Sequence, residues 1–377
     1  MKKRGKKNIY SLGISSLFND IGSEMIAPIL PFYIMALGGG GFAIGALSGI
    51  REGLASIFKI LGGWISDRVG KRKKFVFFGY FISVISRLVL AFVNAWQSVI
   101  GIVGLDRVGK LRDAPRDAII IDSTSKRGKG FGLHQMLDTV GAVIGTILVI
   151  ILFWFLDMGF KQIIVWAAIL SSLALVPLFF VKEYKFKKTK TTLFKGIKLL
   201  NPKLKYFVLV ASVFALANFG LYMFLIVLAK ETFGNNLVPL ILYAVFNIVY
   251  AGLVMRFGTL SDRIGRKKIL FAGYALFFLL SVFLVFFVSK IFVIVSFVLY
   301  GMVYALTNSN QRALASDFIK TKKGTGMGFF NSVSGIGKIL GGVIGGLLWD
   351  VSHILMFGYL AFISLISIVL LFFVREK

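Results

Sequence analysis

Charged side chains recur inside the long apolar segments of this chain, where a charge is costly and a function is the usual reason for keeping it. An acid that loses its cationic neighbour in such surroundings binds a proton more readily, and a nearby arginine can take or release that acid. These residue types therefore predict proton transfer coupled to movement. The candidates for proton coupling or for lining a cavity are Asp20, Glu24, Arg51, Glu52, Asp106, Arg107, Lys110, Asp113 and Asp117.

The depth of these groups follows from helix geometry. A helix that enters a bilayer near Ile9 rises roughly 1.5 Å per residue, which brings Asp20 close to the midplane and Glu24 one turn farther along the same face. We expect one of these two acids to release and take up the proton, while Arg51 or Arg107 exchanges partners; a permanently paired structural network is the alternative. Four further residues fall near the middle of the second and fourth apolar segments, and all six could converge in one cavity: Arg51, Glu52, Asp106 and Arg107.

The fourth apolar segment carries a ladder of alternating charge. Asp106, Lys110, Asp113 and Asp117 follow one another at steps of four, three and four residues. On a continuous helix this spacing places the four side chains on one face. The pattern predicts a water-lined half-channel that opens to the cytoplasm.

The elements that must position these groups are membrane spans. Hydrophobic residues make up 57% of the 377 residues and form stretches of about 20, the length of a membrane-crossing helix. Helices satisfy their own backbone in lipid, and the alternation of a barrel strand is absent, so an all-α protein is predicted. The twelve predicted spans cover residues 9–36, 42–65, 75–94, 97–122, 131–156, 162–182, 206–230, 238–257, 269–288, 291–316, 325–349 and 353–374.

The charge of the chain is distributed unevenly between its two sets of loops. The formal net charge is +28, yet one set of loops holds only Lys161, Lys230 and Lys290 among the lysines and arginines. The basic loops are expected in the cytoplasm together with both termini, facing anionic lipid. Lipid rather than nucleic acid is therefore the expected partner of the basic surface.

A sequence motif that occurs twice, which we call the repeated phrase, divides the chain into related halves. The first copy runs from Gly63 to Lys74 and the second from Gly258 to Lys268, an offset of 195 residues. A signature repeated at this distance between apolar segments predicts two pseudo-symmetric six-helix bundles. The expected divisions are an N-terminal bundle at residues 1–182, a cytoplasmic linker at 183–205 and a C-terminal bundle at 206–377.

The repeated phrase also resembles the signature of the major facilitator superfamily, Gly-x-Leu-x-Asp-Arg-x-Gly-Arg-Lys/Arg, over both loops. The stretch from Leu105 to Asp117 resembles a prokaryotic branch of mostly uncharacterised permeases. The resemblance implies that the acid of each loop pairs with an arginine at the cytoplasmic end of a later span and stabilises the outward-facing state. Helix termination combined with the charge rule is the alternative reading. The latch residues so implied are Gly63, Asp67, Arg68, Gly70, Arg112, Arg116, Gly258, Asp262, Arg263, Gly265 and Arg312, with Arg112 or Arg116 as the partner of Asp67 and Arg312 as the partner of Asp262.

Two further patterns favour structural roles. His134 and Asp138 are one turn apart, but a metal site needs more ligands, and the chain has no cysteine and only two histidines. Gly141 and Gly145 are spaced for close helix packing. The family's antiporters carry a proline after such a stripe, whereas Thr146 stands here, which weakens the case for an antiporter.

Together these features predict a transporter of the cell membrane. No catalytic or phosphate-binding motif is present, and nothing calls for a cofactor or a metal ion, so an enzyme is not expected. The preferred hypothesis is a monomeric secondary active transporter that exports a small organic solute by alternating access, coupled to protons. The alternatives are uptake of a small organic anion held by Arg51 or Arg107, by symport or passively, then metal export, then a receptor that does not transport.

Overall fold

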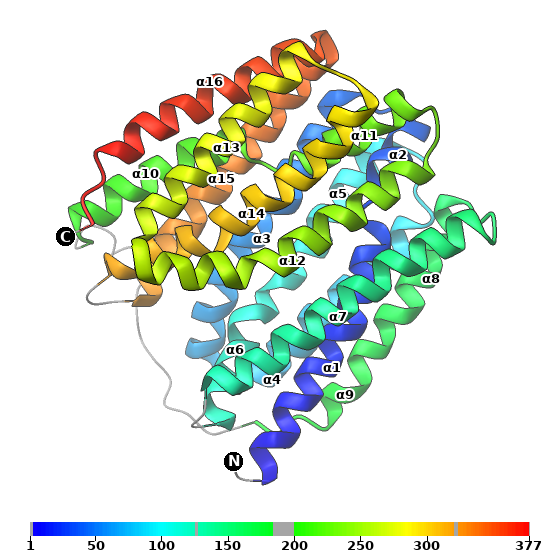
Figure 1. Ribbon diagram of the computed structural model, residues 1–377. Coiled ribbons are helices and arrows are strands. Elements are labelled where there is room, and N and C mark those ends of the chain that lie inside the picture. The colour runs from blue at the N-terminus through cyan, green and yellow to red at the C-terminus, as the bar shows by residue number, and fades with distance from the viewer. Residues whose placement is uncertain (1–2, 125–126, 184–199, 320–322, 377) are drawn as a thin grey trace. The chain divides into compact units, whose positions relative to one another are not determined.

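The computed structural model describes residues 3–124, 127–183, 200–319 and 323–376, and it is helical throughout these ranges (Figure 1). The helices are α1 (Lys3–Ile26), α2 (Leu30–Ala36), α3 (Gly41–Val69), α4 (Arg72–Leu90), α5 (Trp96–Val108), η1 (Gly109–Arg112), α6 (Asp113–Ser123), α7 (Arg127–Trp154), α8 (Phe160–Ser172), η2 (Leu173–Leu175), α9 (Val176–Phe179), α10 (Pro202–Ala217), α11 (Tyr222–Phe233), α12 (Leu237–Ile264), α13 (Arg266–Phe286), α14 (Lys290–Asp317), α15 (Lys323–Val351) and α16 (His353–Phe372).

Each predicted span coincides with one helix or with a helix that is interrupted. Among the described residues, eight helical stretches are long and apolar enough to cross a membrane by length and composition, and all eight lie after residue 129. The first four predicted spans correspond to α1 with α2, α3, α4, and α5 with η1 and α6. These four contain most of the charged residues found within the predicted spans, which lowers their hydropathy without changing their helical form.

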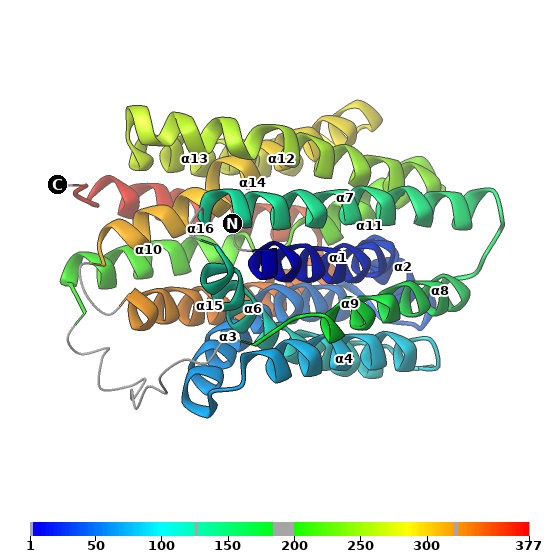
Figure 2. The same ribbon diagram turned by 90° about the horizontal axis from the view of Figure 1, so that it is seen from below.

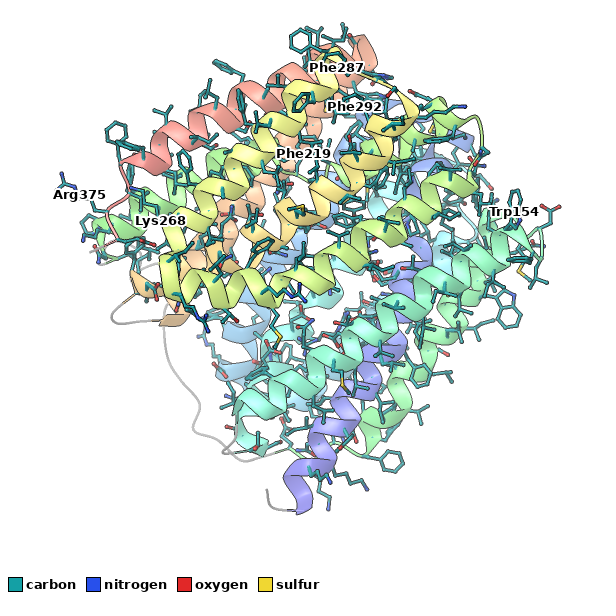
Figure 3. The ribbon with its side chains drawn as sticks, viewed as in Figure 1. Trp154, Phe219, Lys268, Phe287, Phe292 and Arg375 are labelled. Carbon is teal, nitrogen blue, oxygen red and sulfur yellow. The ribbon has the colours of Figure 1, made fainter. Side chains whose placement is uncertain are left out.

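Aromatic side chains crowd the ends of several helices on the outside of the molecule. Trp154 closes α7, while Phe287 and Phe292 flank the turn between α13 and α14 (Figure 3). The rings of Phe287 and Phe292 stack with centroids 5.5 Å apart, although both side chains are exposed. Exposed aromatic rings at helix ends are typical of the boundary between lipid and water.

The chain divides into two compact units. Unit 1 comprises Met1–Tyr33 and Phe58–Thr191, and unit 2 comprises Ile34–Ile57 and Thr192–Lys377. The divisions fall within α2 and α3, so the first part of α3 is grouped with unit 2. The predicted bundles at 1–182 and 206–377 remain a prediction. Most of the predicted linker, residues 184–199, lies outside the described residues.

Unit 1 is built around α1, which packs along α7 and α8 (Figures 1 and 2). Two glycines of α7 allow this approach: a Cβ added at Gly141 would meet the backbone of Leu17, and one at Gly145 the backbone of Ile21. The glycine stripe of this span therefore serves close packing. A second contact of α1 is polar, since Asn8 Nδ2 donates to the carbonyl oxygen of Lys182 at 2.9 Å.

In unit 2 the first part of α3 packs on α15 through glycines of both helices. A Cβ added at Gly45 would meet the backbone of Gly342 and Gly346. At the start of this contact, Asp350 accepts hydrogen bonds from the backbone N–H groups of Gly41 and Phe42, at 2.6 and 2.7 Å. A carboxylate at a helix N-terminus satisfies donors that have no partner within the helix and complements its dipole.

The glycine contact gives a stability prediction. Gly45→Ala should lower the free energy of unfolding by about 1–3 kcal/mol, because the added methyl group must push two backbones apart. The measurement is thermal unfolding of the purified protein. Gly252→Ala is the matched control, since that helical glycine has nothing within 4 Å of the added Cβ, and its stability should stay level or rise by up to about 1 kcal/mol. Equal effects of the two substitutions would contradict the close packing.

Candidate functional site

The centre of unit 1 is an arginine whose donors join four helices. Arg87 of α4 is 4% exposed. Its Nη1 donates to the carbonyl oxygen of Asn19 on α1 at 2.9 Å and to Ser171 Oγ on α8 at 2.5 Å. Its Nε lies 3.8 Å from Asp106 Oδ1 on α5. The guanidinium therefore fixes the positions of three other helices around α4.

Asp106 is held by a second guanidinium as well. Arg107 pairs with Asp106 Oδ2, and both side chains are buried. An acid between two guanidinium groups is stable as an anion in a low-dielectric site. Asp106 and Arg107 thus compensate each other's charge inside unit 1.

Most contacts of Arg112 are with neutral groups, although its Nε also lies 4.0 Å from Asp113 Oδ1. Its Nη1 donates to Ser83 Oγ and to the carbonyl oxygen of Gly109, both at 2.9 Å, and to the carbonyl oxygen of Gly79 at 3.2 Å. The guanidinium also lies 4.3 Å from the centroid of the Tyr80 ring. Such a cation–π contact is strongest when desolvated, and Arg112 is 2% exposed. Arg112 is therefore a structural anchor between α4 and η1.

The predicted charge ladder is interrupted. The chain forms a 3₁₀ helix at Gly109–Arg112 between α5 and α6, so the spacing of a continuous α-helix does not apply across it. Beyond this turn Asp113 lies 3.7 Å from Lys59 and 3.5 Å from Arg116, and Arg116 donates to Asp117 at 3.0 Å. Asp113 and Asp117 still lie one turn apart on α6, and both are paired with cations.

Asp20 differs from the other acids of unit 1. It is half-buried on α1, and Asn19 Nδ2 donates to its Oδ1 at 3.0 Å. Within the described part of the chain no cation forms an ion pair with it. The charged groups that act on it electrostatically at longer range are Asp138, Lys110, Arg112 and Glu24.

In the first copy of the repeated phrase, one arginine pairs with two acids, and we call such an arrangement an arginine bridge. Arg72 Nη2 lies 3.0 Å from Asp67 Oδ1, and its Nη1 lies 2.7 Å from Asp122 Oδ2. The expected pairing of Asp67 with Arg112 or Arg116 differs from this arrangement. The reason is local, because Gly70 at φ +80° turns the chain back and brings Arg72 to the end of α3.

The second copy builds the same bridge. Arg266 lies 3.3 Å from Asp262 and 2.9 Å from Asp317. Gly265, at φ +101°, provides the turn. Arg312, the expected partner of Asp262, is exposed on α14 and forms no ion pair among the described residues.

In each copy of the repeat, the arginine of the bridge is followed by a lysine. This lysine donates hydrogen bonds to an acid and to a carbonyl oxygen near the C-terminal end of the same unit's last described helix. The backbone N–H of Lys73 donates to Glu183 at 3.1 Å and its Nζ to a carbonyl oxygen of α9 at 3.1 Å. The backbone N–H of Lys267 donates to Glu376 at 2.5 Å and its Nζ to a carbonyl oxygen of α16 at 2.7 Å. Glu183 and Glu376 are not among the site residues predicted from the sequence. Their recurrence near the offset of the repeat is the signal that could have identified them.

The remaining latch residues have simpler surroundings. Arg68 lies 5.6 Å from the ring centroid of Trp64, and Arg263 is exposed. A Cβ at Gly63 would come within 3.0 Å of the Ala114 side chain, whereas one at Gly258 would meet nothing within 4 Å. Only the first of the two glycines is therefore required for close packing.

Arg51 and Glu52 belong to unit 2 and the other cavity candidates to unit 1, so convergence of the six residues remains a prediction. Arg51 is buried, and Glu52 pairs with Lys338 of α15 at 3.2 Å. In unit 1 His134 Nδ1 lies 3.3 Å from Asp138 Oδ2. Among the described residues no group of three or more side chains is arranged to hold a metal ion.

Known proteins resemble this chain over nearly its whole length. Residues 12–331 and 208–377 match the model of the Major Facilitator Superfamily. An uncharacterized MFS-type transporter of Methanocaldococcus jannaschii is 40% identical over 98% of this chain and 95% of that protein. The multidrug resistance protein MdtH of Photorhabdus laumondii is 26% identical over 92% of this chain and 88% of that protein.

Solved structures agree with the predicted fold. A mutant of the nucleoside transporter NupG superposes with a TM-score of 0.81 at 14% identity, covering 97% of this chain and 98% of that chain. The peptide transporter POT in complex with sulfate superposes with a TM-score of 0.76 at 15% identity, covering 98% of this chain and 93% of that chain. The predicted all-α membrane fold is confirmed, and likeness at such identities shows the fold alone.

The arginine bridges give a second prediction. Arg72→Gln should lower the free energy of unfolding by about 1 kcal/mol, because two partly exposed ion pairs are lost and two acids remain near each other. Arg266→Gln should act in the same direction in unit 2. Thermal unfolding of the purified variants is the measurement, with Arg68→Gln as the matched control because it removes an arginine outside the bridge. A loss as large in the control would contradict a specific role for the bridge.

Proposed function

This chain belongs to the Major Facilitator Superfamily, and from that premise we propose that it exports a small organic solute in exchange for protons by alternating access. Membership makes the protein a multi-pass membrane transporter rather than an enzyme. The transported solute, the direction and the use of protons are the proposal. The cytoplasmic location of both termini, which the lysine distribution supports, is part of it.

One observation carries the proton coupling: the half-buried Asp20 of α1 has a neutral amide, not a cation, as its hydrogen-bond partner. An acid without an ion pair in a membrane segment can become neutral without leaving a cation unpaired. Asp106, Asp113 and Asp117 differ in this respect, because each forms an ion pair with a cation. Protonation of Asp106, for example, would leave two buried guanidinium groups without their anion.

The surroundings of Asp20 connect its charge to neighbouring helices. Asn19, whose amide binds Asp20, also offers its backbone carbonyl to Arg87. Asp20 interacts electrostatically with Asp138 of α7 and with Lys110 of η1. A proton that binds Asp20 therefore changes the balance of charge between α1, α7 and η1, and α1 is one of the helices that the Arg87 contacts join.

Two observations support export: the name of one relative, and the ion pair that Arg107 already forms. The relative named a multidrug resistance protein covers most of this chain. Uptake of an organic anion would need a cationic side chain that can bind the anion. The charge of Arg107 is already compensated by its ion pair with Asp106. Thr146, in the place of the antiporter proline, is a departure from the antiporter pattern and leaves the direction to experiment.

Transport in proteoliposomes tests the proposal with three probes of similar shape: 2-phenylethylamine, 3-phenylpropionate and phenylalanine. A proton gradient directed from the exterior to the cytoplasmic face should drive one of them the opposite way. One pH unit corresponds to about 1.36 kcal/mol per proton, which sustains about a tenfold solute gradient at one-for-one exchange. Asp20→Asn should remove this accumulation and leave only exchange down the solute gradient.

Asp157→Asn is the matched control, because it makes the same change at an exposed acid between α7 and α8. Accumulation that persists in Asp20→Asn would remove Asp20 from the coupling role. Flux that ignores the proton gradient in the unmodified protein would instead identify a passive facilitator.

A further inference from the structure

Unit 2 contains a membrane span whose helix is broken. α10 ends at Ala217 and α11 begins at Tyr222, with Gly220 at φ +111° between them. Tyr300 closes part of the break, because its hydroxyl accepts from the backbone N–H of Leu221 at 3.0 Å and donates to Asn218 Oδ1 at 2.8 Å. Irregular backbone at membrane depth is tolerated where protein buries it or where it lines a cavity, and transporters use such breaks for binding.

The broken segment lies against α3. Ser48 Oγ is 3.0 Å from the carbonyl oxygen of Phe219 and 2.9 Å from that of Gly220. Glu52 lies one turn beyond Ser48 on the same helix face. A Cβ added at Gly220 would be 3.4 Å from Glu52 Cγ and 3.5 Å from Tyr222 Cε1. The carboxylate side chain, the broken backbone and an aromatic ring therefore meet at one place.

Glu52 is paired here with a cation from a different helix. Lys338 Nζ of α15 lies 3.2 Å from Glu52 Oε2. About a quarter of each side chain is exposed, 26% for Lys338 and 27% for Glu52. Arg51 is the neighbouring charged residue on α3, and its side chain departs about 100° around the helix from that of Glu52. An ion pair with this exposure can be reached by a solute and can exchange its cation.

A cluster of aromatic rings interacts with Glu52. We define the tyrosine cluster as Tyr222, Tyr243, Phe246, Tyr250, Tyr300 and Tyr304, whose neighbouring ring centroids lie 5.1 to 6.1 Å apart. Glu52 interacts electrostatically with Tyr300 and Tyr304. Ring faces and a carboxylate both attract a positive charge, and both disfavour an anion.

The geometry points to a binding site for an organic cation, in which the amine of the solute replaces Lys338 on Glu52 and its apolar body packs on Tyr250 and Tyr304, the partly exposed members of the tyrosine cluster. This inference rests on the proposed function and names its substrate class. Exchange of one cation for another keeps Glu52 paired, and the displaced Lys338 ammonium, on a flexible side chain that is 26% exposed, can be solvated by water. Lys338 is thus a tethered competitor of the solute.

Binding of the three phenylalkyl probes to the purified full chain, measured by titration calorimetry, tests this inference. 2-Phenylethylamine should bind best. Glu52→Gln should weaken its binding about tenfold or more, because a charge-assisted hydrogen bond is lost. Lys338→Met should tighten its binding, because the competitor is removed. Opposite effects of the two substitutions on one ligand are the signature of a cation site.

Matched controls remove the same charges elsewhere in unit 2. Glu231→Gln changes an acid that lies 3.7 Å from His353, and Lys290→Met a lysine 5.9 Å from the Phe233 ring centroid. Both should bind 2-phenylethylamine as the unmodified protein does. If either single variant fails to fold, Glu52→Gln/Lys338→Met removes both charges together, and this variant should fold and bind the amine weakly.

Each other outcome overturns the inference. Preference for 3-phenylpropionate, with weaker binding in Lys338→Met, would make the lysine an anion site. Preference for phenylalanine, with weaker binding in both variants, would make the pair a zwitterion site. Unchanged binding in both variants, or binding of none of the probes, would make the pair structural. The proposed function is tested separately, because proton-driven flux of any probe that depends on Asp20 upholds it whatever Glu52 binds.

Discussion

A bilayer offers no water to a buried polar group, so each such group must find its partner within the chain. The two units meet this constraint with different chemistry. In unit 1, Arg87 and Arg112 use their donors on carbonyl and hydroxyl groups of neighbouring helices. In unit 2, the hydroxyl groups of a tyrosine and a serine form hydrogen bonds with the backbone at the break between α10 and α11. Helix positions in unit 1 thus depend on the contacts of buried arginines.

The two bridges show the same constraint at the ends of the spans. In each unit an arginine just past a left-handed glycine joins the acid of the repeated phrase to an acid at the end of a later helix. A cation between two acids reduces their mutual repulsion and ties together helices that the chain connects by long routes. The repeat therefore preserves an interaction, which explains why both copies keep an acid, a glycine and a basic residue in that order.

Much of this architecture could be predicted from the sequence, because hydropathy and the repeated phrase are local signals. The helices at all twelve predicted spans follow from them. Asp67 and Asp262 each pair with an arginine, although not with the expected one. The partners of those acids could not be predicted, since they depend on how a glycine turns the chain. The break at Gly220 and the 3₁₀ turn at Gly109–Arg112 were missed for a related reason. A hydrophobic pattern shows the length of a span but carries little information about interruptions within it.

The contrast between Asp20 and Glu52 gives the two acids different capacities. Asp20 is hydrogen-bonded to an amide and forms no ion pair among the described residues, so in the proposed function a proton would bind it without breaking an ion pair. Neutralising Glu52 would leave the Lys338 ammonium without its anion, which makes protonation the costlier change there. The proposals therefore assign cation exchange to Glu52 and proton binding to Asp20. Because these acids belong to different units, a solute at one and a proton at the other would each act on its own unit. On these proposals, coupling would pass through α3, the helix that belongs to both units; its first part carries Glu52 and its second part carries Lys59, the partner of Asp113.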